Sequence, residues 1–281
     1  MWRINCIKGH TNMKKKLPML LVLPAIMLSA CGYGAEVTDS SEIKGLMDGI
    51  SAKTEEVKNL EMKMTSKATA YDEDLKKNVT TDGNLIFCMN SESEMYMYTS
   101  SQTSEGEKSE ETVYYVKDQN NKSVLAIQEY NPQTKKNDDI IAYGENDSGA
   151  TLAAFAFLAP LLLYATYANP ATFVSSLNDE TVMSAASVEL ASEAKYYSKG
   201  EGNLTIVVEA KTTAEVKKED KEQTVSETET IIYDNYHISM VVSEGVTNKG
   251  NKTKAEMTFT VKDSLAIDLP SSWVESINKK S

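Results

Sequence analysis

Hydrophobic and polar residues alternate with a period of two over much of the chain. The segment 60–65 shows the pattern clearly, since Leu60, Met62 and Met64 alternate with charged or polar residues. Strict alternation of this kind predicts antiparallel strands that have one buried and one solvated face. The same period recurs in further segments, which are 84–90, 95–100, 112–117, 123–130, 203–211, 236–243 and 255–262.

The alternation also assigns the side chains of each predicted strand to a face of the sheet. The residues expected on the apolar face of the segment 236–243 are Tyr236, Ile238, Met240 and Val242. His237 is then expected to face solvent. The polar runs 101–111 and 214–230 are expected to be hairpin tips or extensions of the neighbouring strands.

Two segments follow a helical pattern instead. In 38–59 the apolar residues recur at helical spacing, and Asp39 with Glu42 can form a capping box at the start of the helix. The second segment, 150–168, has nineteen residues without a charge, and seven of them are alanine. Pro160 is expected to kink or split this helix, and Asn169-Pro170 is expected to end it and to start a short second helix.

The apolar segment 150–168 could cross a membrane or cover the sheet. It is just long enough to span a bilayer core, at about 1.5 Å of rise per residue. However, it lacks the flanking basic residues that accompany membrane spans, and a crossing would place the two groups of strands in different compartments. We therefore expect the segment, including Phe155 and Leu161, to pack over the apolar face of the sheet.

The order of the predicted elements indicates the fold class. A helix is followed by about five strands, then by the apolar helical region and by about five further strands. One continuous, curved antiparallel sheet with helices on its apolar face is the simplest arrangement of these elements, which is an α+β fold. We expect a single domain over residues 39–275 and a polar tail over residues 276–281.

The N-terminus has the pattern of an export signal. Lys14, Lys15 and Lys16 precede an uncharged apolar stretch that ends in Leu28-Ser29-Ala30-Cys31. This ending resembles the lipobox of bacterial lipoproteins, and the resemblance implies that a diacylglyceryl group is attached to the Cys31 sulfur and that the chain is cleaved before it. Residues 1–30 are then the signal, with Met13 as the true start, and residues 31–38 are a flexible tether. An ordinary secretory signal with an incidental cysteine is the alternative.

Charge excludes one class of partner. The chain has a formal charge of −12, and the residues after the basic N-terminal 30 hold 24 basic and 41 acidic residues. Because the phosphate backbone of a nucleic acid would be repelled by such a surface, the sequence predicts no nucleic-acid partner. The expected location is extracytoplasmic, anchored to the cell membrane through the lipid at Cys31.

No catalytic or cofactor-binding pattern stands out. Beyond the predicted signal, the chain has one histidine, His237, and one cysteine besides Cys31, which is Cys88. Cys88 lies in an apolar segment and is expected to be a small buried hydrophobe. The sequence therefore predicts no nucleophilic, metal or cofactor site, and no enzyme. The acidic clusters 71–77 and 144–149 leave a carboxylate hydrolase or a calcium site as a minor alternative.

Methionine is unusually frequent in the predicted strands. Seven of the nine methionines beyond the predicted signal lie there, and methionine side chains form soft, adaptable apolar surfaces. They could line a groove for a flexible apolar ligand, or they could simply fill a core. The residues that we name as candidates for such a groove are Met62, Met64, Met95, Met97, Phe155, Leu161, Met240 and Met257.

The lipobox at 28–31, the helix that leads into NLEMKMTSKAT, and helices that interrupt an antiparallel sheet together resemble the LolA/LolB-type superfamily of lipoprotein carriers. The LppX/LprG-type lipid-binding lipoproteins share that fold. The resemblance implies a half-barrel sheet whose concave apolar face is covered by helices, with acyl chains bound between them.

The sequence leaves two functions open. The first is a lipid-anchored protein that binds or shuttles a lipid or another apolar ligand in a groove between sheet and helices, without catalysis. The second is a structural or regulatory lipoprotein of the cell envelope, whose core is solidly packed and which acts through a protein partner.

Overall fold

The computed structural model describes residues 32–54, 57–118, 121–144, 157–176, 188–216 and 221–278. These residues form one large, open antiparallel sheet with a small number of helices, so the predicted fold class is confirmed. The predicted signal, Cys31 and Phe155 lie outside the described residues.

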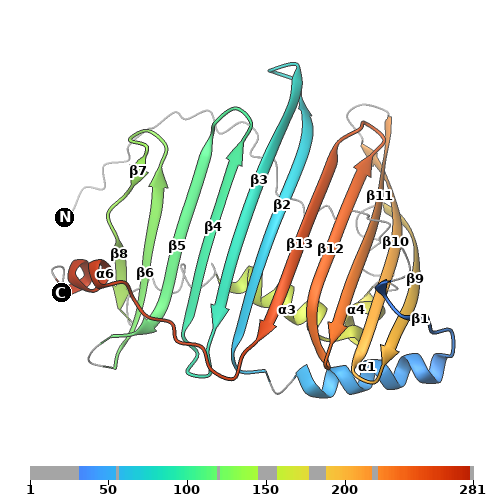
Figure 1. Cartoon of the computed structure of the whole chain (residues 1–281). Helices are drawn as coiled ribbons and strands as arrows, with labels where there is room; N and C mark the ends of the chain where they lie inside the picture. The colour runs from blue at the N-terminus through green and yellow to red at the C-terminus, as the bar shows by residue number, and fades with distance from the viewer. Residues whose placement is uncertain are drawn as a thin grey trace, which may run out of the picture.

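Two meanders make up the sheet (Figure 1). The strands of the first are β2 (Leu60–Asp72), β3 (Lys77–Met89), β4 (Met95–Thr103), β5 (Lys108–Lys117), β6 (Ser123–Asn131), β7 (Lys136–Asn137) and β8 (Ile141–Gly144). The strands of the second are β9 (Val188–Gly200), β10 (Asn203–Val216), β11 (Lys221–Asp234), β12 (His237–Thr247) and β13 (Lys252–Val261). The polar runs 101–111 and 214–230 are thus largely strand extensions.

The last strand, β13, pairs antiparallel with β2 and joins the two meanders into one sheet. In this pairing Met257 lies opposite Met64, and Phe259 lies opposite Met62. The apolar faces of the two halves therefore continue into each other, which gives one contiguous core across the middle of the sheet.

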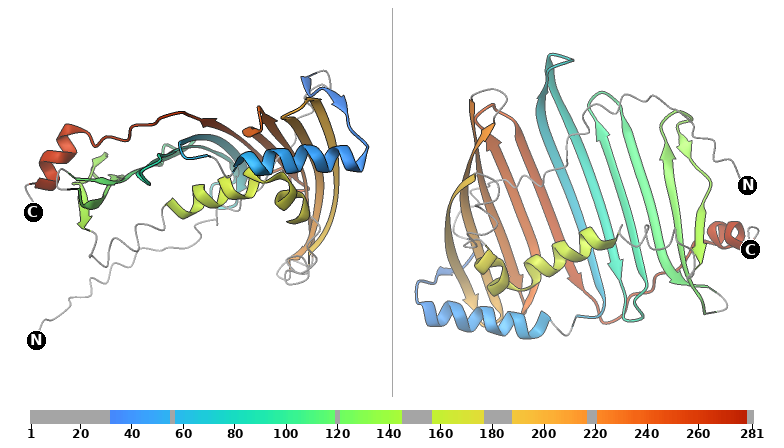
Figure 2. Two further views of the ribbon diagram at one scale, coloured as in Figure 1. Left: turned by 90° about the horizontal axis from the view of Figure 1, so that it is seen from below. Right: turned by 180° about the vertical axis from the view of Figure 1, so that it is seen from behind.

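The sheet is strongly curved, and helices cover its concave face (Figure 2). α3 (Leu158–Ala168) and α4 (Pro170–Ser176) lie across this face, and α1 (Ser40–Thr54) runs along the ends of the strands of the second meander. On the outer, convex face, the C-terminal segment and α6 (Ser271–Asn278) cross the first meander.

Asp39 caps the start of α1, which is the Asp39 half of the predicted capping box. The Asp39 carboxylate accepts hydrogen bonds from the backbone N–H groups of Ser41 and Glu42, which caps the first turn. Met47 and Ile50 from the inner side of the helix are buried in the main core. This packing offsets the low helix propensity of the two glycines within α1.

The described part of the apolar segment, residues 157–168, forms α3, and α4 follows it after Asn169. α3 begins at Leu158, so Pro160 lies in its first turn, where its missing N–H breaks no hydrogen bond of this helix. Residues 151–156, where a split at Pro160 would be seen, lie outside the described residues. The predicted stop and restart at Asn169-Pro170 is confirmed: Asn169 is the C-cap of α3, and its side-chain oxygen accepts a hydrogen bond from the Thr172 N–H in α4. Among the described residues, no helix has the length and apolar character needed to span a membrane.

An irregularity between β11 and β12 changes the predicted faces. Ile232 pairs with Met240, but the next residue, Tyr233, pairs with Ile238, so Ser239 is an extra residue in β12. Val241 rather than Met240 therefore joins Ile238 in the core. The placement of Met240 on the apolar face was wrong, because strict alternation cannot anticipate a bulge. His237 is half-buried at the start of β12 rather than fully exposed.

Both ends of the predicted domain also differ from the expectation. Ala35 and Glu36 form β1, which pairs with β9, and the neighbouring Tyr33 and Val37 are buried. The described part of the predicted tether is therefore docked on the sheet. At the other end, α6 runs beyond residue 275, and Ile277 packs against the apolar cluster beneath it.

Candidate functional site: the covered concave face

Most of the residues that the sequence analysis names as groove candidates lie on the concave face. Met62, Met97 and Met257 are buried in the main core, and Met64 and Met95 are half-buried against it. Leu161 of α3 also packs against this core. Of the eight groove candidates, six therefore meet on one face, Met240 lies on the other, and Phe155 is outside the described residues.

α3 covers this face through aromatic side chains. Phe157 is almost fully buried and its ring centre lies 6.4 Å from that of Phe87 in β3. About two helical turns further on, the ring of Tyr164 lies 6.1 Å from that of Phe259 in β13. The outer side of α3 remains apolar and uncovered, with Leu162 exposing 57% of its surface. The helix thus presents apolar side chains both to the sheet and to solvent.

A buried polar cluster joins the helices to the sheet at the α3–α4 junction. The Tyr167 hydroxyl donates a hydrogen bond of 2.5 Å to the Glu229 carboxylate in β11. The Tyr233 hydroxyl, also in β11, donates a hydrogen bond of 2.6 Å to the backbone carbonyl of Tyr167. Both bonds are buried, so they fix the end of α3 over β11.

α1 holds the same junction from the other side. The Thr54 hydroxyl donates a hydrogen bond of 2.8 Å to the Ala168 carbonyl, and the Ser51 hydroxyl donates one of 3.1 Å to the Asn169 side-chain oxygen. The C-terminal end of α3 is therefore fixed by hydrogen bonds from two elements. For the rest of α3, the contacts with the sheet described above are apolar.

The electrostatic state of Glu229 is unusual. Burial raises the pKa of its carboxyl to about 7, the hydrogen bond from Tyr167 opposes this shift, and the nearby Glu227 adds to it. Burial also raises the pKa of the Tyr167 hydroxyl, which keeps this group protonated as the donor. A carboxyl that titrates near neutral pH in an apolar surface is a mark of many functional sites.

Sequence reasoning missed Glu229, although the signal was present. Glu229 shares its alternation phase with Ile231 and Tyr233, both of which are buried on the concave face. A glutamate in phase with core residues is expected to point inward. The polarity of the segment 214–230 predicts a hairpin tip or a strand extension, and this interpretation does not extend the alternation of Ile231 and Tyr233 back to Glu229.

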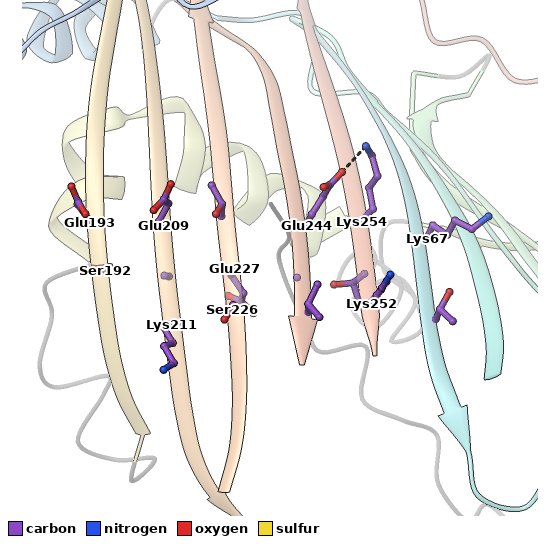
Figure 3. A pocket seen from close by; sticks show the side chains of 16 residues that line it. Lys67, Ser192, Glu193, Glu209, Lys211, Ser226, Glu227, Glu244, Lys252 and Lys254 are labelled. Atoms are coloured by element: carbon purple, nitrogen blue, oxygen red, sulfur yellow. Dashed lines mark hydrogen bonds and ion pairs between the residues drawn. The ribbon is translucent and has the colours of Figure 1, made fainter. Parts of the chain in front are cut away.

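A hollow of about 880 Å³ lies on the outer face across β9 to β13 and β2 (Figure 3). Its charged side chains come from alternate positions of these strands; they include Glu193, Glu209, Lys211, Glu244, Lys254, Lys252 and Lys67. The Lys254–Glu244 ion pair, at 2.7 Å, is partly exposed. Mixed, solvated charges of this kind contribute little binding energy, so we regard this hollow as surface rather than as the site.

The other sequence candidates show no reactive arrangement among the described residues. Cys88 is buried on the outer face against Ile267 of the C-terminal segment, and burial raises the pKa of its thiol, which disfavours the reactive thiolate. The acidic cluster 71–77 lies at the tip of the β2–β3 hairpin, and most of 144–149 lies outside the described residues. In the described part of the chain, no group of three or more metal-ligating side chains is close enough to hold an ion.

Comparisons with known proteins add little. No family model matches the chain, and no curated protein matches it. One similar solved structure is the crystal structure of a DUF1329 family protein from Desulfovibrio piger, which is 8% identical. The match covers 80% of this chain and 95% of that chain with a TM-score of 0.24, a level of likeness from which we draw no conclusion.

Proposed function

We propose that this protein is a lipid-anchored, extracytoplasmic protein that binds or shuttles a lipid or another apolar ligand between the concave face of its sheet and α3–α4. It does so without covalent catalysis. Cys31 carries the anchor, and the ligand contacts the methionine side chains of β2, β4 and β13.

One observation supports this proposal above the others. The concave face is lined by Met62, Met64, Met95, Met97 and Met257 and is covered by a short helix that is itself apolar on both sides. Methionine side chains adapt to irregular apolar partners, and a helix that is held by hydrogen bonds at one end can move at the other. These are the properties that a ligand groove with a movable cover requires.

The alternative is a packed envelope protein that acts through a protein partner. The fully buried side chains of Leu60, Met62 and Phe87 favour tight packing at the centre of the core. In that case the partner would contact exposed apolar side chains such as Leu158 and Leu162.

Native mass spectrometry of a soluble form that starts after Cys31 tests the proposal. We expect an apolar molecule to be retained from the host membrane or to be taken up from lipid vesicles. Two half-buried methionines provide a matched pair: Met64→Trp fills the concave face, whereas Met240→Trp changes the outer face.

The expected result is that Met64→Trp lowers the bound fraction at least fivefold and that Met240→Trp leaves it unchanged, with both variants folded by circular dichroism. A folded wild-type protein that neither retains nor takes up any apolar molecule would contradict the proposal and favour the packed alternative.

A further inference from the structure

Two buried polar residues face each other on the concave side of the sheet. Glu229 in β11 pairs directly with Ser243 in β12, so both side chains lie on the same face. Glu229 exposes 6% of its surface and Ser243 none. The Ser243 hydroxyl is buried without a hydrogen-bond partner, which costs free energy and calls for an explanation.

Small side chains continue the row of this pair across the strands on the side of β13, β2 and β3. The row of paired residues that passes through Glu229 and Ser243 continues with Ala255 in β13, Ser66 in β2 and Gly83 in β3. The next row on the same face, on the side of α1, holds larger side chains, among them Ile231, Val241, Met257 and Met64. The polar pair thus lies where a surface of long apolar side chains changes to one of short side chains.

The charges near the pair have one sign. Among the described residues of this row and of the two adjacent rows on the same face, from β9 to β4, the only ionisable acids or bases other than tyrosine are Glu229 and Glu227. These rows contain no lysine, arginine or histidine. A negatively charged head group would be repelled here, whereas a cation would find a carboxylate with a hydroxyl acceptor beside it.

We propose that Glu229 and Ser243 bind the ammonium group of an amphiphile whose apolar chain lies along the methionine-rich part of the concave face. The inference rests on the proposed function and names the ligand class: an alkylamine-type molecule rather than a fatty acid or a neutral lipid. The ammonium donates one hydrogen bond to the Glu229 carboxylate and another to the Ser243 oxygen. Tyr167 continues to donate to Glu229, and because Ser243 is fully buried, the chain that covers it must move aside for the ligand to enter.

A purely structural role for Glu229 makes a different prediction. If its carboxyl served only to hold Tyr167, Ser243 would have no part in binding, and the head group of a bound amphiphile would not matter. The selectivity between head groups therefore separates the two roles.

The test uses the full-length protein in nanodiscs and three radiolabelled dodecyl amphiphiles: dodecylamine, dodecanol and dodecanoate. Equilibrium dialysis measures their binding, and empty nanodiscs correct for partition into lipid. The variants are Glu229→Gln, Ser243→Ala and, as a control, Glu256→Gln, since Glu256 is exposed on the outer face of β13. Thermal unfolding verifies that each variant is folded.

We expect the wild-type protein and Glu256→Gln to bind dodecylamine at least tenfold more tightly than dodecanol, and dodecanoate most weakly. Glu229→Gln should reduce the preference for the amine to threefold or less, and Ser243→Ala should reduce it in part. Binding of all three probes with equal affinity would overturn this inference and leave the proposed function standing. Binding of none of them would overturn both.

Discussion

At the scale of single residues, Glu229 combines burial, a hydrogen bond from α3 and a pKa near neutrality. An ordinary glutamate in the unfolded chain has a pKa near 4.5. The folded protein therefore holds the proton more tightly than the unfolded chain does. Between these two pKa values the unfolded chain loses its proton first, so the free energy of unfolding falls as the pH rises.

This difference predicts a pH-dependent stability. From pH 4.5 to pH 7 the wild-type protein should lose about 3 kcal/mol relative to Glu229→Gln, because each unit of pKa difference is worth about 1.4 kcal/mol. Urea unfolding at pH 5 and pH 8 measures the effect in both proteins. Equal pH dependence in the two proteins would show that Glu229 does not titrate in this range.

At the scale of an element, α3 is apolar on both sides, but only one side contacts the sheet. Leu161 and Tyr164 pack against the core, whereas Leu158 and Leu162 are exposed. Its composition makes the helix apolar all round. Only its docking on the sheet decides which of its residues contribute to the free energy of unfolding.

Substitutions at two adjacent residues of α3 compare the contributions of its sheet-facing and exposed sides to stability. Leu161→Asp should lower the free energy of unfolding by about 2–4 kcal/mol, because it places a charge against the apolar core and removes a packed side chain. Leu162→Asp should change it by less than about 0.5 kcal/mol, as is usual for an exposed site. Chemical denaturation compares the two, and equal losses would contradict the docking of α3 through Leu161.

At the scale of the whole molecule, the sheet is covered on both faces by segments from different parts of the chain. α3 and α4 lie on the concave face, and the C-terminal segment packs Ile267 and Trp273 on the outer face. At the N-terminal end, Tyr33 is already docked, with its ring 5.8 Å from that of Tyr197 in β9. Under the proposed function, a lipid on Cys31 would hold the membrane within two residues of this ordered edge.

Anchoring at Cys31 is the prediction at this scale. Cys31→Ser should leave an unprocessed precursor, or should release the protein from membranes if another peptidase cleaves it. Cell fractionation with mass determination of the N-terminus distinguishes these outcomes, and Cys88→Ser serves as the control. Normal membrane retention of a processed Cys31→Ser protein would show that Cys31 is not the anchor.

The sequence by itself determined the curved antiparallel sheet, the capped helix α1, the break at Asn169 and the apolar cover. Period-two alternation, Asp39, Asn169-Pro170 and a long uncharged run are local signals, and they carry their meaning without knowledge of the rest of the chain. For the same reason, Met62, Met64, Met95, Met97, Met257 and Leu161 could be predicted to share one face.

The tertiary structure alone decided what depends on contacts between distant segments. The extra residue Ser239 moved Met240 to the outer face, because a bulge is set by the pairing of two strands and not by one strand alone. The docking of Tyr33 and the packing of the C-terminal segment need a surface that exists only after the sheet has formed. Glu229 became a candidate because α3, far from it in sequence, covers it, and burial is a property of the folded molecule.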